Sequence, residues 1–163
     1  DYAALRAGEL FKTVYENLTI EAGAAEVENT DAGEPEAPAN GPIKTDKGFV
    51  TVTPAGGFIY DEAQSDKSSL AFTNTSLGAN AAVYVYDEQS MEYEVQKKQF
   101  GYAYPNKEYT SVTIGANTFD AIESNTGVTY LVAKTSTGNA MYVMVWSCSV
   151  ADATPLIETI VIN

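Results

Sequence analysis

Neighbouring carboxylates are the residues of this sequence whose spacing comes closest to a catalytic arrangement. The three pairs are Asp61 with Glu62, Asp87 with Glu88, and Glu92 with Glu94. Two carboxyl groups hydrolyse a glycosidic bond when they flank that bond across a cleft, which adjacency along the chain does not establish. These pairs fall in predicted loops or at the start of a predicted helix, where solvated acids are ordinary. A hydrolase with a carboxylate pair is therefore an alternative and not the main hypothesis.

Other catalytic chemistry lacks its residues. The sequence has no histidine, which removes Ser-His-Asp and Cys-His machinery, histidine-ligated metals and the usual general base at neutral pH. Its one cysteine, Cys148, permits no intrachain disulfide and no zinc-binding cysteine cluster, and its apolar neighbours favour a small core residue. No glycine-rich phosphate loop, G-x-S-x-G or H-E-x-x-H motif occurs. We expect a protein that is not an enzyme and that uses no cofactor or metal.

Four aromatic residues around Pro105 form the sharpest candidate binding feature. They are Phe100, Tyr102, Tyr104 and Tyr109. Exposed tyrosines on a loop suit recognition of a protein or a glycan, because they offer a large contact area at low entropic cost. The alternative is that these side chains fold back over a sheet. Trp146 lies in the middle of an apolar run, so we expect it in the core.

Charge and length limit the class of function. The 163 residues carry 22 acidic and 9 basic side chains, a net charge of -13, which repels nucleic-acid backbones and anionic membranes. No apolar run reaches the ~18 residues of a membrane-spanning helix. The chain starts at Asp1 without a signal-like segment, so we expect a processed product. Few lysines among many Thr, Asn, Ser, Gly and Tyr resemble an extracellular or cell-envelope protein.

The first 46 residues are the more acidic part of the chain, with 10 acidic and 3 basic side chains. Apolar residues between Leu10 and Leu18 fall on one helical stripe, which predicts an amphipathic helix over residues 1–20. Such a helix either packs on the domain or binds a partner, including a second copy of the chain. Residues 21–46 are rich in Pro, Ala and Glu and predict a solvated linker without calcium-binding spacing. A single domain is expected over residues 47–163.

The stretch from residue 127 to residue 150 organises that domain. Two apolar runs, rich in β-branched and aromatic residues, flank a turn at residues 136–139, which predicts an antiparallel hairpin. Both faces of the second run are apolar, with Val143 on one and Tyr142 on the other. We therefore expect an interior strand that is covered on both sides.

Shorter apolar runs predict the remaining elements. Strands are expected at residues 48–52, 58–60, 70–73, 81–86, 110–114 and 118–123. A helix is predicted over residues 87–103, capped by Asp87 or Ser90. Thr154 and Pro155 favour a second helix within residues 151–163, with a strand as the alternative for its β-branched end. Consecutive strands with short turns predict an α+β fold, a mainly antiparallel sheet of about six to seven strands flanked by helices as an α/β/α sandwich.

Five segments follow one another in an order that is typical of one fold group. They are G-F-x-x-x-x-P-x-G at residues 48–56, a short apolar strand at 70–74, a hydrophobic strand with a helix at 82–103, V-x-I-G-x-x-x-F at 112–119, and a T-x-x-G turn at 135–138. In this order they resemble the Mog1/PsbP-like group, over about residues 47–163. The group includes small secreted or lipid-anchored bacterial proteins of unknown role, photosystem accessory proteins and a regulator of a nuclear transport GTPase. The resemblance implies a fold, and it carries no catalytic motif and no set of functional residues.

We therefore expect a non-enzymatic exported or cell-surface domain that acts by binding a protein or a ligand. The first alternative is a structural subunit of an extracellular or envelope assembly, which predicts self-association through residues 1–20. The second is the hydrolase, which predicts an enclosed pocket with facing acids. A binding domain instead predicts a monomer with an exposed aromatic patch.

Overall fold

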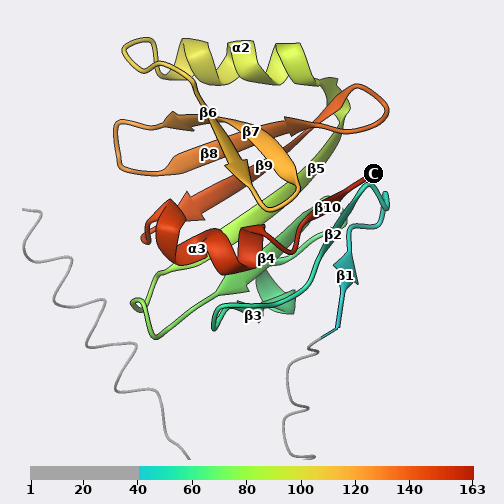
Figure 1. Ribbon diagram of the computed structural model, residues 1–163, viewed down its shortest axis with the longest axis vertical. Helices are drawn as coiled ribbons and strands as arrows, with labels where there is room; N and C mark the ends of the chain where they lie inside the picture. The colour runs from blue at the N-terminus through green and yellow to red at the C-terminus, as the bar shows by residue number, and fades with distance from the viewer. Residues whose placement is uncertain (1–40) are drawn as a thin grey trace, which may run out of the picture. The chain divides into compact units, whose positions relative to one another are not determined.

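A seven-stranded antiparallel sheet organises the fold. The structure is a computed structural model that describes residues 41–163. The sheet has the strand order β3-β4-β5-β9-β8-β7-β6 (Figure 1). In chain order, its strands are β3 (Ile59–Tyr60), β4 (Ser69–Thr73), β5 (Ala82–Glu92), β6 (Thr110–Ile114), β7 (Asn117–Glu123), β8 (Thr129–Lys134) and β9 (Asn139–Trp146). Two meanders join where β5 pairs with β9, and β9 is the middle strand of the sheet. The antiparallel pairing of β8 with β9 confirms the predicted hairpin.

Helices and a second, three-stranded sheet cover the two faces of the large sheet. The remaining elements are β1 (Ile43–Lys44), β2 (Val50–Val52), the short 3-10 helix η1 (Glu62–Gln64), α2 (Tyr93–Ala103), α3 (Val150–Ile157) and β10 (Val161–Ile162). The small sheet, in the order β1-β2-β10, and α3 pack on one side, which we call the inner face (Figure 1). α2 lies on the other side, the outer face. This mixed α+β domain confirms the predicted class and is consistent with an α+β sandwich.

Alternation along β5 separates the two faces. Val83 and Val85 point to the inner face and are fully buried, whereas Tyr84 and Tyr86 point to the outer face and are half-buried. β-Branched residues suit this position because they pack well on a pleated surface. Side chains from both sheets and α3 complete the inner core, among them Val50, Phe72, Phe119, Leu131, Met141 and Leu156. Burying one such side chain stabilises the fold by about 1.5–3 kcal/mol.

The buried carboxylate of Asp87 joins the small sheet to the large one. It accepts hydrogen bonds from the Thr45 hydroxyl (2.5 Å), the Phe49 N–H (3.3 Å) and the Gln89 amide (2.6 Å). A carboxylate removed from water is tolerated when such donors replace the water. Residues 43–46, assigned to the linker from the sequence, are therefore part of the folded domain.

The helix predicted from Asp87 begins later than expected, so its predicted start is wrong. β5 continues to Glu92 because Asp87 and Glu88 still pair with β9, and a register irregularity follows them. Neither Asp87 nor Ser90 caps α2, whose N-cap position is Glu92 without a side-chain hydrogen bond. Pairing with the middle strand of the sheet outweighs the local preference of these polar residues for a helix start.

The end of the chain is a short helix followed by a strand, and the prediction of one helix within residues 151–163 is wrong in extent. Ser149 caps α3 through a capping box with Asp152, so the predicted cap at Thr154 is also wrong. Pro155 lies inside the helix. The chain then returns to β2, where β10 pairs with it antiparallel. The strand alternative for the β-branched end is confirmed.

The predictions for residues 1–20, and for residues 21–40 of the linker, lie outside the described residues. In the part of the chain that the structure does describe, no helix is long and apolar enough to cross a membrane. Cys148 packs against the inner core, and burial raises the pKa of its thiol. A raised pKa disfavours the reactive thiolate, as expected for a small core residue.

Replacing Thr45 by valine tests the anchor at Asp87. T45V keeps the shape of the side chain but removes the closest donor to a buried carboxylate. We expect the free energy of unfolding in urea to fall by about 1–3 kcal/mol, measured by circular dichroism. Thr75→Val, at an exposed position, is the matched control and should change stability by less than about 0.5 kcal/mol. Equal losses in the two variants would contradict the anchor.

Candidate functional site

Stacked aromatic rings hold α2 over one end of the outer face. Phe100 of α2 stacks on Tyr130, with ring centroids 4.5 Å apart, and meets Tyr142 edge-on at 5.4 Å. Tyr86 stacks on Tyr142 at 4.5 Å, and Tyr84 on Tyr86 at 6.5 Å. We call these five residues the aromatic row. Each pair contributes about 0.5–1.5 kcal/mol beyond area burial, so the row fixes α2 and continues past it onto the sheet.

The structure brings only two of the four predicted binding residues together on the surface, because Tyr102 and Tyr109 line one hollow of about 380 Å³ beside α2. Phe100 and Tyr104 stack on the outer face of the sheet. Tyr109 donates its hydroxyl to the Lys97 carbonyl at 2.8 Å. Of the four, only Tyr102 stands in solvent, 82% exposed. Folding back over the sheet, the alternative given by the sequence, therefore describes Phe100 and Tyr104, while Tyr109 contacts Lys97 of α2.

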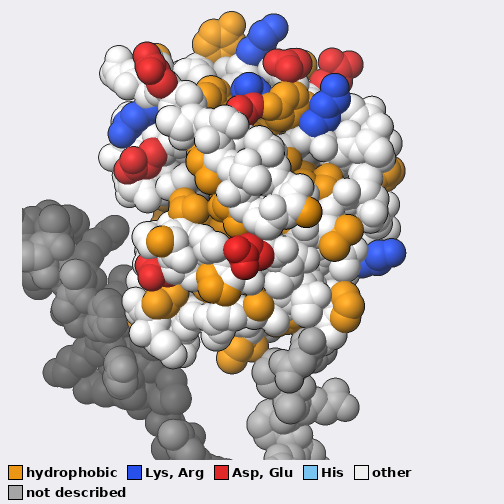
Figure 2. Space-filling view, viewed as in Figure 1, with side chains coloured by type: hydrophobic (Ala, Val, Ile, Leu, Met, Phe, Trp, Pro, Cys, Tyr) orange, Lys and Arg blue, Asp and Glu red, His pale blue; other side chains and the backbone are white. Residues whose placement is uncertain are grey.

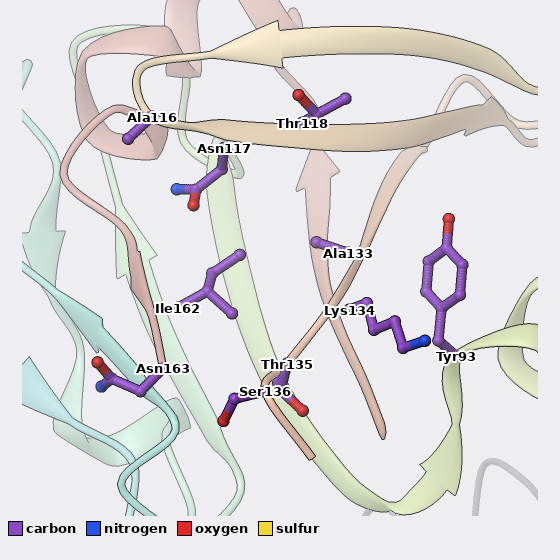
Figure 3. Close-up of a pocket in the computed structure, with 10 residues that line it drawn as sticks. All are labelled: Tyr93, Ala116, Asn117, Thr118, Ala133, Lys134, Thr135, Ser136, Ile162 and Asn163. Carbon is purple, nitrogen blue, oxygen red and sulfur yellow. The ribbon is translucent and has the colours of Figure 1, made fainter. Parts of the chain in front are cut away.

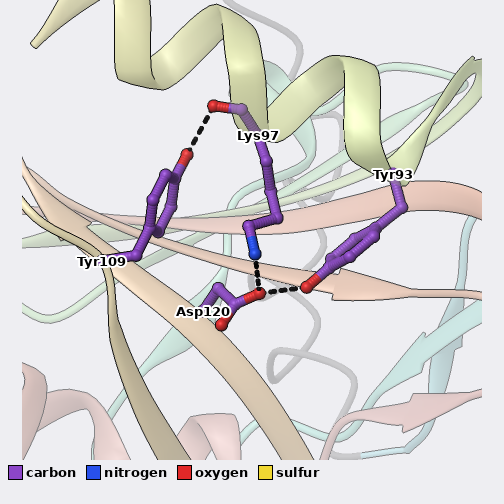
Figure 4. Close-up of polar contacts among 4 residues, drawn as sticks. All are labelled: Tyr93, Lys97, Tyr109 and Asp120. Atoms are coloured by element: carbon purple, nitrogen blue, oxygen red, sulfur yellow. Dashed lines mark hydrogen bonds and ion pairs between the residues drawn. The ribbon is translucent and has the colours of Figure 1, made fainter.

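A polar clamp joins α2 to β7 (Figure 4). Lys97 Nζ lies 2.6 Å from Asp120 Oδ2, and the Tyr93 hydroxyl also donates to that carboxylate. The rings of Tyr93 and Tyr109 lie 5.2 and 5.1 Å from the ammonium group, in cation–π geometry. Burial acts to raise the pKa of the Asp120 carboxyl, but the two hydrogen bonds outweigh it and hold the pKa below its usual value. Because both charged groups have partners, we interpret the clamp as structural.

The other end of the outer face is open and forms a hollow of about 440 Å³ over the ends of β4, β5 and β9. Its lining residues are Gln64, Thr73, Ala79, Asn80, Ala82, Tyr84 and Trp146, and we call it the open hollow. Trp146 is 45% exposed, so the prediction that it lies in the core is wrong. α2 packs around Tyr130 and Tyr142 and contributes no residue to this lining. α2 therefore does not cover this end of the outer face, where Ala71 and Ala82 are buried and Trp146 is exposed.

The two rings of the open hollow come from adjacent strands. Trp146 is paired with Ala82, two residues before Tyr84, so both rings project from the same face. The Tyr84 hydroxyl donates to Gln64 Oε1 at 2.8 Å, and Gln64 Nε2 donates to Asp61 Oδ2 at 2.8 Å. Asp61 also caps η1 through its side chain. The Gln64 amide is therefore held in place beside the rings.

A larger depression of about 590 Å³ lies where the β6–β7 turn, the β8–β9 turn and the last residues of the chain meet (Figure 3). Its polar groups bond to one another. Asn117 Nδ2 donates to the Ile160 carbonyl (2.7 Å), and the Ser136 N–H donates to the Asn163 carbonyl (3.0 Å). These bonds hold the segment around β10 against the large sheet, so we interpret this depression as a structural junction.

The carboxylate pairs have separate surroundings. Asp61 caps η1, while Asp87 faces the inner core and Glu88, the next residue of β5, points to the outer face. The third pair lies at the N-cap and first turn of α2. Among residues 41–163, no group of three or more His, Cys, Asp or Glu side chains is placed to hold a metal ion.

No charged side chain lines the open hollow, although the Asp61 carboxylate borders it through its hydrogen bond with Gln64. Figure 2 shows lysine, aspartate and glutamate side chains concentrated around α2 and the loops near it. α2 and the loop after it carry Glu94, Lys97, Lys98, Lys107 and Glu108. The seven residues of the open hollow include no charged side chain. The hollow is thus an uncharged site on a chain of net charge -13.

Comparison with protein-family models, with curated proteins and with solved structures finds no match to this chain. The clamp pairs its two charged groups with each other, and the larger depression bonds Asn117 and the Ser136 N–H within the chain. The open hollow presents the exposed Trp146 ring to solvent beside the half-buried Tyr84 ring. The aromatic residues at alternate positions of β5 and β9 could have indicated this site from the sequence. Nothing in the sequence around η1 indicated that Gln64 lies beside those rings.

The aromatic rings packed beneath α2 predict a pH limit for the fold. Burial raises the pKa of Tyr130 to about 12 and that of Tyr109 to about 12, whereas an unfolded tyrosine ionises near ~10. The folded state favours the neutral phenols, so their contribution to stability is present below pH ~10 and is lost as the pH rises toward ~12. Tyrosinate absorbance should therefore show a late phase that coincides with unfolding by circular dichroism. In urea the same titration should show one earlier phase, and Tyr130→Phe should reduce the late amplitude. A single early phase in the folded protein would contradict this burial.

Proposed function

We propose that this domain is a non-enzymatic binding module that holds its partner or ligand in the open hollow. The observation that carries the proposal is the exposed Trp146 ring beside Tyr84 in a concave site. Large aromatic side chains are enriched among the residues that dominate binding energy, and small-molecule sites are concave with a few placed polar groups. The Gln64 amide, fixed by two hydrogen bonds, is such a group.

The chemistry of the lining supports binding over catalysis. Acid–base catalysis at neutral pH needs a group that gains and loses a proton near pH 7. Among the seven lining residues, Tyr84 is the one titratable side chain, and its hydroxyl is bonded to Gln64. The carboxylate pairs that motivated the hydrolase alternative lie apart from the hollow, except for Asp61, which orients Gln64.

We propose further that the protein acts at the cell surface or in the envelope and has a Mog1/PsbP-like fold. Its composition supports the location, with few lysines among many small polar residues. The element order supports the fold group, because β5 leads into α2 and four meandering strands and α3 follow. Gly56 of the first motif has φ +64°, and a Cβ there would lie 2.7 Å from Pro155 Cβ, so that motif packs on α3. The structural-subunit alternative depends on residues 1–20 and stays a prediction.

Two aromatic variants of the full chain test the binding site. W146A removes the ring in the open hollow, and Y102A removes the most exposed ring elsewhere on the outer side. The three proteins are applied to an array of immobilised oligosaccharides and extracellular peptides. We expect at least one immobilised ligand to bind wild type and Y102A equally and to bind W146A at least about tenfold more weakly. Circular dichroism checks that both variants fold. Binding that is equal in all three proteins, or absent from all of them, would contradict the proposed site.

A further inference from the structure

The open hollow also indicates the chemical class of its ligand. We infer that it binds a neutral carbohydrate, an inference that rests on the proposed binding function of this site. Two rings, Trp146 and Tyr84, project into the hollow from adjacent strands on one face. An aromatic face carries negative charge density, and the C–H groups on one side of a sugar ring are weakly positive. Stacking a pyranose on an indole therefore combines apolar burial with electrostatic attraction.

The polar groups around the rings also suit the hydroxyl groups of a sugar. Gln64, Asn80 and Thr73 line the same hollow and offer two carboxamides and one hydroxyl. A carboxamide presents a donor and an acceptor side by side, which matches the neighbouring hydroxyl groups of a sugar. Asp61 and Tyr84 already hold the Gln64 amide, so ordering this group on binding costs little further entropy.

Charge and size narrow the ligand further. No charged side chain lines the hollow, so a sulfated, phosphorylated or uronate-rich ligand finds no cation there to neutralise it. The net charge of -13 repels such polyanions as well. The volume of about 440 Å³ lies within the roughly 300–1,000 Å³ of small-molecule sites. An uncharged polyol with apolar ring faces fits both limits.

The position of the hollow in the sheet disfavours an extended peptide. Peptides that add to a sheet use the unpaired backbone groups of an edge strand. The hollow lies over β4, β5 and β9, and each of these strands is already paired on both sides. Side chains alone must recognise the ligand here. The rings and amides suit a sugar, whose binding requires no strand partner.

Titration of the full chain with neutral hexasaccharides tests this inference. The panel contains β-1,4-linked oligomers of glucose, xylose, mannose and N-acetylglucosamine and α-1,4-linked glucose, with heparin and polygalacturonate as anionic probes. Because Trp146 is the chain's single tryptophan, its fluorescence reports on the hollow directly. We expect at least one neutral oligomer to change the emission and to protect it from acrylamide, and the anionic probes to do neither.

Calorimetry on variants then separates a sugar site from other binding. We expect W146A to lower the affinity for the neutral oligomer by about tenfold or more. W146F should retain most of this affinity, and Y102A should leave it unchanged. Gln64→Leu removes the amide and keeps a side chain of similar size. It should lower the affinity for the sugar several-fold, whereas the affinity for an apolar partner should not change. If only peptides bind in a Trp146-dependent way, the carbohydrate inference is overturned and the binding function stands. If nothing binds in that way, both are overturned.

Discussion

The pairing of β5 with β9 is the constraint on which the rest of this domain depends. It joins two meanders, β3-β4-β5 and β6-β7-β8-β9, into one sheet and runs from Ala82 opposite Trp146 to Glu92 opposite Asn139. On its inner face it fully buries Val83, Val85, Val143 and Val145. A slip of one residue would move all of these side chains to the outer face, so the register is strongly specified. This register holds to Glu88 opposite Ala140, and β5 reaches Glu92 after a register irregularity.

The length of β5 decides which part of the outer face is covered. Because the strand ends at Glu92, α2 begins at the far end of the face, and Lys97 meets Asp120 there while Phe100 meets Tyr130. The helix therefore packs on β7, β8 and part of β9. The other end of β5 and β9 keeps its rings but has no helix above them. Trp146 is thus exposed because α2 starts at the opposite end of the outer face.

Alternating patterns in the sequence predicted the strands well, and long-range packing explains the errors. The hairpin β8–β9 and strands β4 and β6 were predicted because apolar period and turn residues agree locally. The start of α2 and the end of α3 were not, because pairing of Asp87 with β9 and of β10 with β2 overrides local preference. Trp146 was placed in the core because both faces of its strand are apolar. Sequence pattern cannot show which end of a face a distant helix covers.

The same limit applies to the candidate site. Aromatic residues were identified around Pro105 because they cluster in sequence, yet Phe100 and Tyr104 pack against the sheet, Tyr109 bonds to α2, and Tyr102 is the exposed one. The open hollow instead assembles Gln64, Tyr84 and Trp146, which are far apart in the chain. Their proximity follows from the strand order β4-β5-β9, and strand order was not readable from local pattern.

Acrylamide quenching of Trp146 in the full chain tests the central claim, that this end of the outer face is open to solvent. Trp146 is the chain's single tryptophan, so the emission has one source. Because the ring is 45% exposed, we expect a quenching constant well above that of a buried indole and below that of the same chain unfolded in urea. An indole shielded as completely as a core residue would contradict the account, since the hollow would then be closed and unavailable to any ligand.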